Sequence, residues 1–318
     1  MNIAVIGAGM AGLTAARILQ SAGAEVTVFD KSKGTGGRLS SRSYAGGWID
    51  HGAPYLSAGS SGFYDFLHDH LDAGILQDWQ ASLTGEPGEA EQVHFIGVPR
   101  NSAITRSLLG SLIFQPSTRI ARLEAVEKGW LLYNDGDSLL GTWQQVVIAV
   151  PAPQVLPLIR QYQLWVALVK SVVMEPCWVA AIQTARDLPW LSDVNFFQHP
   201  VIHRVTRNSA KPGRQNDHVY LVQATRRWSE DHLEQPPESI ASELQKNFNA
   251  MFPAVVDSEP LFAHRWRYAL TDKALGQPFL WDESLQLGVC GDWCLGRSVE
   301  DAWQSGMQLA GHIVQAAK

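Results

Sequence analysis

The chain has 318 residues, 46% of them apolar and only 18% charged, which is enough to bury a core in one large or two moderate domains. A formal net charge of −6 and a pI near 5.9 argue against a nucleic-acid partner or an anionic membrane, because either favours a basic face. No apolar run approaches the roughly 18 residues of a membrane span, and the N-terminus lacks the basic start of a signal peptide. We therefore expect a globular, soluble, cytoplasmic protein.

The N-terminal residues form the strongest pattern in the chain. An apolar run at 3–6 is followed at once by Gly7-Ala8-Gly9-Met10-Ala11-Gly12, then by a helical stripe and by a second strand that ends at Asp30. In such a unit the first glycine permits a tight turn, the second admits a pyrophosphate, and the third lets helix and strand pack closely. Asp30 follows Gly12 by 18 residues, near the spacing at which a carboxylate accepts hydrogen bonds from a ribose. This order predicts a dinucleotide-binding βαβ unit.

A second glycine cluster favours FAD over a dissociable nicotinamide cofactor. Lys31-Ser-Lys-Gly34-Thr-Gly36-Gly37-Arg38 begins directly after the ribose acid and places an arginine fork where it could hold the pyrophosphate. The cluster resembles the second signature of flavoproteins such as amine oxidases and aromatic hydroxylases. The cofactor contacts expected from these two segments are Gly7, Gly9, Met10, Ala11, Gly12, Asp30, Lys31, Gly37 and Arg38.

Farther along, residues 40–51 suggest a hairpin whose second arm continues through 52–56 and returns toward the cofactor. This return makes Ala53, Pro54 and Tyr55 candidate cofactor contacts. A helix is expected to begin near Ala103, with Asn101 or Ser102 as its N-cap.

The remaining pattern predicts two domains. Segments 120–126 and 130–133 form a hairpin, and 143–150 is a buried strand; Ile120 is a further candidate cofactor contact. Between 155 and 285, long strands and one helix at 238–251 show no βαβ rhythm, which predicts a mostly antiparallel substrate domain. We assign 1–75, 97–154 and 286–318 to an FAD-binding domain, and 76–96 and 155–285 to the substrate domain.

The C-terminal segment returns to the nucleotide domain. A strand at 285–289 leads to Gly291-Asp292, and a helical stripe begins at Val299. Asp292 could hold a ribityl hydroxyl, with Val299 beside the flavin at the helix N-terminus; alternatively, Asp292 is simply a helix-start residue. The three cysteines, Cys177, Cys290 and Cys294, show neither disulfide nor metal-ligand spacing, so no metal is expected.

Five segments together resemble the bacterial renalases over essentially the whole chain. They are Gly37-Arg38, Asp50-His-Gly-Ala-Pro-Tyr55, Arg207-Asn-Ser-Ala-Lys-Pro-Gly-Arg214, Ala263-His-Arg-Trp266 and Cys290-Gly-Asp-Trp-Cys-Leu295. The resemblance implies an α/β fold like that of p-hydroxybenzoate hydroxylase, with a Rossmann-type FAD domain and noncovalent FAD. Here Arg297 stands one position farther from Val299-Glu300 than in relatives.

The resemblance also implies a reaction. The 2- and 6-dihydro isomers of NAD(P)H are oxidised to NAD(P)⁺, and dioxygen is reduced to hydrogen peroxide. The partners expected are therefore a small dinucleotide and dioxygen, with no obligatory protein partner. Candidate substrate contacts are Tyr55, Leu56, Phe95, Ile96, Asn208, Lys211 and Arg297.

Several alternatives stay open at this point. Tyr55, Phe95 and Ile96 could be ordinary core, and Asn208 and Lys211 could lie on a solvated loop. The chain shows no nucleophile elbow or paired Cys and His, so the flavin is expected to carry the chemistry. A flavin amine oxidase is the second candidate, with Lys170, Lys211 and Lys273 available near a flavin. A protein that only binds FAD is the third.

Overall fold

The structure is a computed structural model that describes residues 1–45, 47–85, 93–214, 218–253 and 257–316. The chain divides into two compact units, each described here by itself. The first comprises Met1–Gly37, Thr105–Met174 and Thr271–Lys318; the second comprises Arg38–Ile104 and Glu175–Leu270.

The first unit is built on a six-stranded sheet of order β19-β20-β13-β1-β2-β9. Strand β1 (Asn2–Ile6) lies between β2 (Glu25–Phe29) and β13 (Gln145–Ile148) and is parallel to both. The sheet continues in parallel to β20 (Leu287–Val289) and β9 (Ile113–Gln115), and the antiparallel edge strand is β19 (Leu280–Asp282). Because both faces of a parallel sheet are covered, its strands are almost continuously apolar, as the sequence of β13 and β20 shows.

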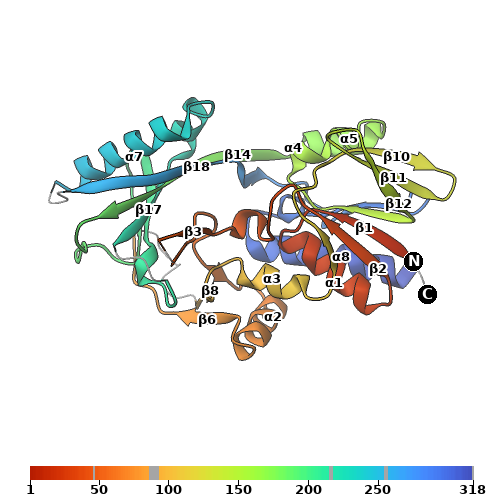
Figure 1. Ribbon diagram of the computed structural model, residues 1–318, viewed down its shortest axis with the longest axis horizontal. Helices are drawn as coiled ribbons and strands as arrows, with labels where there is room; N and C mark the ends of the chain where they lie inside the picture. Colours follow the sequence, from red (N-terminus) through yellow and green to blue (C-terminus); the bar gives the residue numbers. More distant parts are fainter. Residues whose placement is uncertain (46, 86–92, 215–217, 254–256, 317–318) are drawn as a thin grey trace. The chain divides into compact units, whose positions relative to one another are not determined.

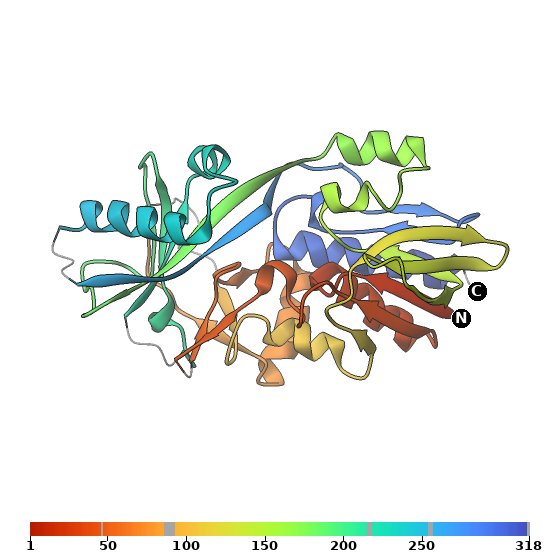
Figure 2. The same ribbon diagram turned by 45° about the horizontal axis from the view of Figure 1, so that its top comes forward.

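Two helices pack side by side in the first unit. They are α1 (Met10–Ser21) and α8 (Val299–Ala316), which lie against each other in both views (Figures 1 and 2). The contact needs a glycine, because a Cβ atom on Gly306 would lie 2.2 Å from the carbonyl oxygen of Ala11. The last helix is therefore held directly against the first turn of α1.

A three-stranded antiparallel sheet completes the first unit. It contains β10 (Ile120–Val126), β11 (Gly129–Asn134) and β12 (Leu139–Trp143). Its buried face joins the core of the main sheet, where Trp143 meets Phe29 edge to face. The connecting segments include α4 (Ala152–Val155), α5 (Gln163–Lys170), and a 3-10 turn η4 (Asp292–Cys294).

The second unit is based on another six-stranded sheet, of order β18-β14-β17-β16-β15-β7. Its strands are β18 (Ser258–Lys273), β14 (Val173–Thr184), β17 (Val219–Ala224), β16 (Ile202–Arg207), β15 (Val194–Phe196) and β7 (Leu83–Thr84). Helix α7 (Pro237–Met251) covers one face, with Ile240, Leu244 and Phe248 recurring every four residues against the sheet (Figure 1). Helix α6 (Arg226–Asp231) precedes it.

Smaller elements complete the second unit. A sheet of order β5-β8-β6 comprises β5 (Leu56–Ser57), β8 (His94–Gly97) and β6 (Leu76–Trp79), accompanied by α2 (Ser61–Asp72). The hairpin of β3 (Arg42–Tyr44) and β4 (Gly47–Ile49) follows the turn η1 (Gly37–Leu39). The turn η3 (Asn208–Ala210) also belongs to this unit, whereas helix α3 (Ala103–Leu109) has only its first two residues in it.

The predicted mixed α/β architecture and its main elements are confirmed. The βαβ unit, the 120–133 hairpin, the 238–251 helix and the C-terminal strand and helix are all present. Within 155–285, the pairs β14–β17, β17–β16 and β16–β15 are antiparallel, and β15 pairs in parallel with β7. Among the described residues, no helix has the length and apolar character needed to cross a bilayer.

The compact units divide the chain differently from the expected domains. Residues 38–75 and 97–104, which we assigned to the FAD domain, belong to the second unit. The reason lies in long-range packing, because Ile49 joins a cluster with Val179 and Leu221, and Asp50 pairs with Lys211. Such contacts between distant segments leave no local signal in the sequence.

Candidate functional site

The first glycine turn has the geometry that its sequence predicts. Gly7 adopts a φ of +116°, and a Cβ atom there would lie 2.3 Å from the Ala149 carbonyl oxygen. A Cβ atom on Gly12 would lie 2.0 Å from the Gly7 oxygen, whereas one on Gly9 would meet nothing within 4 Å. Gly7 and Gly12 are therefore required by close packing, and Gly9 leaves open space beside the start of α1.

Asp30 is tied to the same turn. Its Oδ2 accepts the Ala8 N–H at 2.8 Å, and its Oδ1 accepts the Ser32 N–H at 2.7 Å. An ionised carboxylate has about four lone-pair positions, so these two bonds leave capacity for ribose hydroxyls. Lys31, the next residue, is exposed, and its ammonium contacts Gln154 at 3.3 Å.

The second glycine segment folds onto the first. The Gly36 N–H donates to the Ala8 oxygen at 3.0 Å, and a Cβ atom on Gly37 would lie 3.5 Å from the Gly9 Cα. Both residues have positive φ, +130° and +52° respectively, which glycine adopts most readily. No side chain caps α1 at Gly9, and Met10 and Ala11 form its buried first turn. The two segments thus form one backbone surface of the kind that accepts a pyrophosphate.

Asp292 lies buried in the 3-10 turn η4, where its Oδ2 accepts the Thr271 hydroxyl at 3.2 Å. It does not begin α8, because Ser298 and Asp301 cap that helix through reciprocal hydrogen bonds of 2.8 and 3.0 Å. The helix-start interpretation of Asp292 is therefore wrong for α8. Val299 is half-buried and Arg297 is exposed in the loop before the helix, while Ile120 belongs to the core of the first unit.

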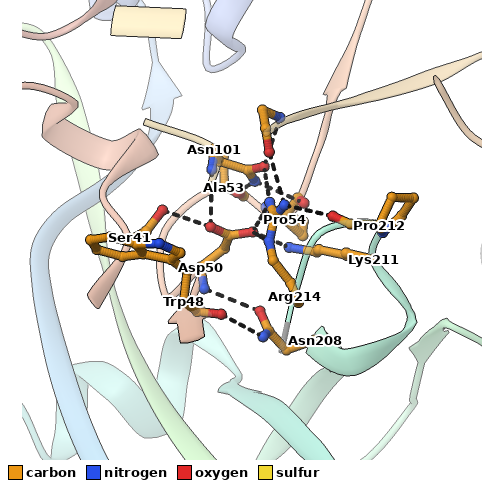
Figure 3. Close-up of polar contacts among 11 residues, drawn as sticks. Ser41, Trp48, Asp50, Ala53, Pro54, Asn101, Asn208, Lys211, Pro212 and Arg214 are labelled. Carbon is orange, nitrogen blue, oxygen red and sulfur yellow. Dashed lines mark hydrogen bonds and ion pairs between the residues drawn. The ribbon is translucent and has the colours of Figure 1, made fainter. Parts of the chain in front are cut away.

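A buried polar network occupies the second unit, centred on Asp50 (Figure 3). The Asp50 Oδ1 accepts the Ser41 hydroxyl at 2.6 Å and the Asn101 N–H at 3.0 Å. The Oδ2 accepts Lys211 Nζ at 3.0 Å and two nitrogens of Arg214 at 3.1 and 2.6 Å. We refer to Ser41, Asp50, Asn101, Asn208, Lys211 and Arg214 as the Asp50 network.

The network joins segments far apart in the chain. Asn101 Nδ2 donates to the carbonyl oxygens of Ala53 at 2.8 Å and Pro54 at 3.0 Å, and its Oδ1 accepts from Arg214. Arg214 also donates to the Gly97 oxygen at 2.8 Å. Of the two expected N-caps of α3, Asn101 is excluded, because its Oδ1 accepts the Gly97 N–H and Arg214; Ser102 is the residue directly before the helix.

Asn208 and Lys211 are the most deeply buried of the predicted substrate contacts with polar side chains. Asn208 accepts the Asp50 N–H at 3.1 Å and donates to the Trp48 oxygen at 2.9 Å. Both side chains lie within the fold, with residue exposures of 0% and 2%, so the alternative of a solvated loop is wrong. No role was predicted for Arg214 from the sequence, although this residue ends one of the segments that carry the resemblance, residues 207–214.

Charge and burial oppose each other in this network. Burial alone would raise the pKa of Asp50, but Lys211 and Arg214 outweigh it and lower this pKa to about 2. Burial lowers the pKa of Lys211 to about 8, although Asp50 acts in the opposite direction. Asp50 is therefore ionised at neutral pH. Lys211 keeps its positive charge at this pH because the attraction of Asp50 offsets part of the effect of burial on its pKa.

The predicted ring contacts lie beside this network. Tyr55 is half-buried, with its ring centroid 4.4 Å from that of His94 and 6.0 Å from that of Trp79. Leu56 pairs with Phe95 between β5 and β8, and neither they nor Ile96 are more than 1% exposed. Among the predicted apolar contacts, Tyr55 is thus the one with surface to offer a ligand.

A histidine pair in the second unit was not anticipated. The ring of His51 stacks on Trp266 at 5.4 Å and meets His264 at 4.7 Å, while the Trp266 indole donates to the His51 oxygen at 2.8 Å. Burial lowers the pKa of both His51 and His264 to about 4, so both are neutral at pH 7. His51 and His264 lie in two of the segments that carry the family resemblance, residues 50–55 and 263–266. These segments are far apart in the chain, so no spacing rule predicts that the two rings meet.

Arg38 is fixed through its backbone and its guanidinium. Its carbonyl oxygen accepts the Ala53 N–H at 2.8 Å, and its Nη1 donates to the Ala269 oxygen at 3.3 Å. A Cβ atom on Gly52 would lie 2.0 Å from the Arg38 oxygen, so the approach requires glycine at that position. The predicted cofactor contacts Arg38, Ala53 and Pro54 are thus held as one group in the second unit.

Comparison with known proteins defines the class of domain first. Residues 5–69 match the family described as NAD(P)-binding Rossmann-like domain. The chain therefore contains a Rossmann-like dinucleotide-binding domain, as the glycine motif predicts.

Whole-chain similarity then relates the fold to particular proteins. A candidate protoporphyrinogen oxidase from Exiguobacterium sp. 255-15 has a TM-score of 0.78 at 11% identity, covering 99% of both chains. A putrescine oxidase double mutant redesigned in cofactor binding has a TM-score of 0.68 at 14% identity, covering 99% of both chains. An oxidoreductase from Methanosarcina mazei has a TM-score of 0.67 at 14% identity, covering 98% of this chain and 100% of its own. The mixed α/β fold is thus similar to that of these three proteins.

Proposed function

We propose that this protein is an FAD-dependent oxidase that converts the 2- and 6-dihydro isomers of NAD(P)H to NAD(P)⁺, with dioxygen reduced to hydrogen peroxide. The observation that carries the cofactor assignment is the contact between the two glycine segments, which joins Gly36 to Ala8 beside Asp30. The renalase-like segments of the sequence supply the substrate class. The fold we propose is that of p-hydroxybenzoate hydroxylase. We further propose that the enzyme acts in the cytoplasm on a small-molecule substrate and needs no obligatory protein partner.

The residues of the first unit fit the ADP portion of FAD. The open side of Gly9 and the uncapped start of α1 suit a pyrophosphate, because backbone N–H groups there can point at an anion. Asp30 would accept the ribose hydroxyls with its remaining lone pairs, and Asp292 would hold a ribityl hydroxyl. Arg38, Ala53 and Tyr55 are the residues of the second unit that we assign to the cofactor.

FAD is proposed to bind without a covalent link. Burial raises the pKa of the Cys290 thiol to about 12 and that of Cys294 well above its usual range, so neither forms the reactive thiolate. Cys177 donates weakly to backbone oxygens. Flavin that stays on the acid-precipitated chain would contradict this proposal.

Bound FAD would supply the redox chemistry, accepting a hydride from the substrate and passing two electrons to dioxygen. The chain's own task is then to bind and orient the substrate ring and to exclude water. We assign ring contact to Tyr55, whose neighbours Trp79 and His94 restrict its orientation, and assign the buried Leu56, Phe95 and Ile96 to the support of this wall.

A flavin amine oxidase is the second candidate, favoured by the whole-length similarity to a putrescine oxidase. Such an enzyme would need a lysine near the flavin. Lys211 is engaged with Asp50 inside the second unit, and Lys170 and Lys273 are exposed residues of the first unit. None of the three has a setting that favours this role.

The experiment that separates the candidates is an aerobic turnover assay on the purified yellow protein. With 2- or 6-dihydro-NAD(P), the proposal predicts one peroxide and one NAD(P)⁺ formed per isomer consumed. Peroxide formed from putrescine or a simple amine, but not from the isomers, would establish the amine oxidase instead. Peroxide from neither substrate class would leave a protein that only binds FAD.

A further inference from the structure

The Asp50 network contains more positive charge than its carboxylate balances. One anion, Asp50, meets two cations, Lys211 and Arg214, so the three groups sum to a formal charge of −1 + 2 = +1, and all three side chains are 0% exposed. Among the described residues, Arg204 of β16 also acts on Lys211, and it too is a cation. An unbalanced buried charge disfavours the folded state, so stability alone does not explain both cations.

Lys211 is the cation that Asp50 does not need for its own charge pairing and hydrogen bonds. Without it, Asp50 still accepts four hydrogen bonds, from Ser41, the Asn101 N–H and two nitrogens of Arg214. Four bonds match the lone-pair capacity of a carboxylate, which is about four. The ammonium has three N–H donors, and the structure gives it one hydrogen-bond acceptor among the described residues, Asp50 Oδ2.

The position of Lys211 connects it with the residues assigned to the substrate. Its Nζ lies 5.7 Å from the ring centroid of Trp79, and Trp79 packs against Tyr55. Through Asp50 it also acts on Asn101, which holds the carbonyl oxygens of Ala53 and Pro54. Both routes end at the Ala53–Tyr55 segment.

We propose that Lys211 is a positioning residue for the substrate ring, which orients the Ala53–Tyr55 segment through Asp50–Asn101 and through Trp79, and that folding does not require it. The inference rests on the proposed function, because that function makes Tyr55 a ring contact. In this proposal Lys211 acts on the substrate through other residues, whereas the sequence predicts a direct contact between Lys211 and the substrate.

The lowered pKa of Lys211, about 8, adds a pH dependence to this role. Below pH 8 the ammonium attracts both Asp50 and the face of Trp79, and the neutral amine formed above pH 8 loses both electrostatic attractions. The groups that set this titration are Asp50 at the end of β4, Arg214 on the same loop and Arg204 of β16. Substrate positioning should therefore weaken above pH 8.

The test compares Lys211→Met with wild type and with Lys246→Met, a control on the exposed face of α7 in the same unit. Methionine keeps the apolar length of the side chain and removes the charge. The measurements are the urea midpoint of unfolding, the FAD absorbance spectrum, and the limiting rate of anaerobic flavin reduction by 2-dihydro-NAD between pH 6 and 9. We expect Lys211→Met to have an unchanged or higher midpoint, and a limiting rate lower by roughly tenfold or more, because small displacements of reacting atoms are costly.

The pH profile distinguishes positioning from a structural role. Wild type should lose rate above pH 8, whereas Lys211→Met should show no such loss, and Lys246→Met should match wild type throughout. A lowered midpoint, a failure of Lys211→Met to fold, or an unchanged limiting rate would overturn the proposal.

Failure of the proposed function gives a different pattern. If putrescine reduces the flavin of the wild type and the isomers do not, the limiting rates of flavin reduction are compared with putrescine as the substrate. A lower rate in Lys211→Met then supports the positioning role, and an unchanged rate overturns it. If neither substrate reduces the flavin, wild type itself lacks the proposed activity, and the positioning role, which needs a substrate, falls with it.

Discussion

Replacement of Asp50 by Asn should be among the most destabilising conservative changes in this chain. The amide keeps the shape of the side chain but removes the negative charge that faces Lys211 and Arg214 in the interior. The pKa of Asp50 is lowered from 3.8 to about 2, so the fold favours the ionised form of this carboxyl group. Loss of one partner of a buried ion pair costs roughly 3–5 kcal/mol, so we expect a loss of about 3 kcal/mol at pH 7.

Urea unfolding followed by tryptophan fluorescence measures this loss, with Asp65→Asn on the exposed face of α2 as the matched control. The double variant Asp50→Asn with Lys211→Met should recover part of the stability, because it removes one of the two unbalanced cations. A loss below about 1 kcal/mol in Asp50→Asn, or a double variant less stable than the single one, would refute the reasoning on buried charge.

Three further predictions concern the cofactor and pH. Asp30→Ala should weaken FAD binding by roughly 1.5–3 kcal/mol through lost charge-assisted hydrogen bonds, and unchanged affinity in a reconstitution titration would exclude a ribose contact. Arg38→Lys should also lose FAD although the charge is kept, because lysine cannot replace the planar fork; equal affinity would show that geometry does not matter there. Since the pKa values of His51 and His264 are lowered from 6.5 to about 4, the unfolded chain binds more protons between these values. Stability should therefore be full above pH 6.5 and fall toward pH 4, and a pH series of unfolding midpoints in which His51→Phe shows the same fall as wild type would contradict this assignment.

The dinucleotide motif could be predicted because its signal is local. Gly7, Gly12 and Asp30 are read from spacing within one βαβ unit, and the structure shows the close backbone contacts that exclude side chains at both glycines. The elements of the C-terminal return were equally clear, since strand and helix periodicity needs no knowledge of distant segments.

The Asp50 network could not be predicted, because its members are distant in sequence. Asp50 and Lys211 are 161 positions apart, and Asp50 and Asn101 are 51 apart, so no spacing rule connects them. Asn101 suits a helix N-cap by residue type, yet its Oδ1, the atom that would cap the helix, accepts the Gly97 N–H and Arg214 instead. Lys211 in a Lys-Pro-Gly-Arg segment indicates an exposed loop, and only the fold shows it inside.

The most direct test of the central claim is a set of anaerobic stopped-flow reductions of the purified flavoprotein. The account predicts that 2- and 6-dihydro-NAD bleach the flavin far faster than ordinary 4-dihydro-NADH or putrescine. Hydride transfer needs reacting atoms within about 3–3.5 Å, and a rigid ring pose that presents carbon 2 can present carbon 6 by turning over, but not carbon 4. Equal rates for 4-dihydro-NADH and the isomers, or faster bleaching by putrescine, would contradict it.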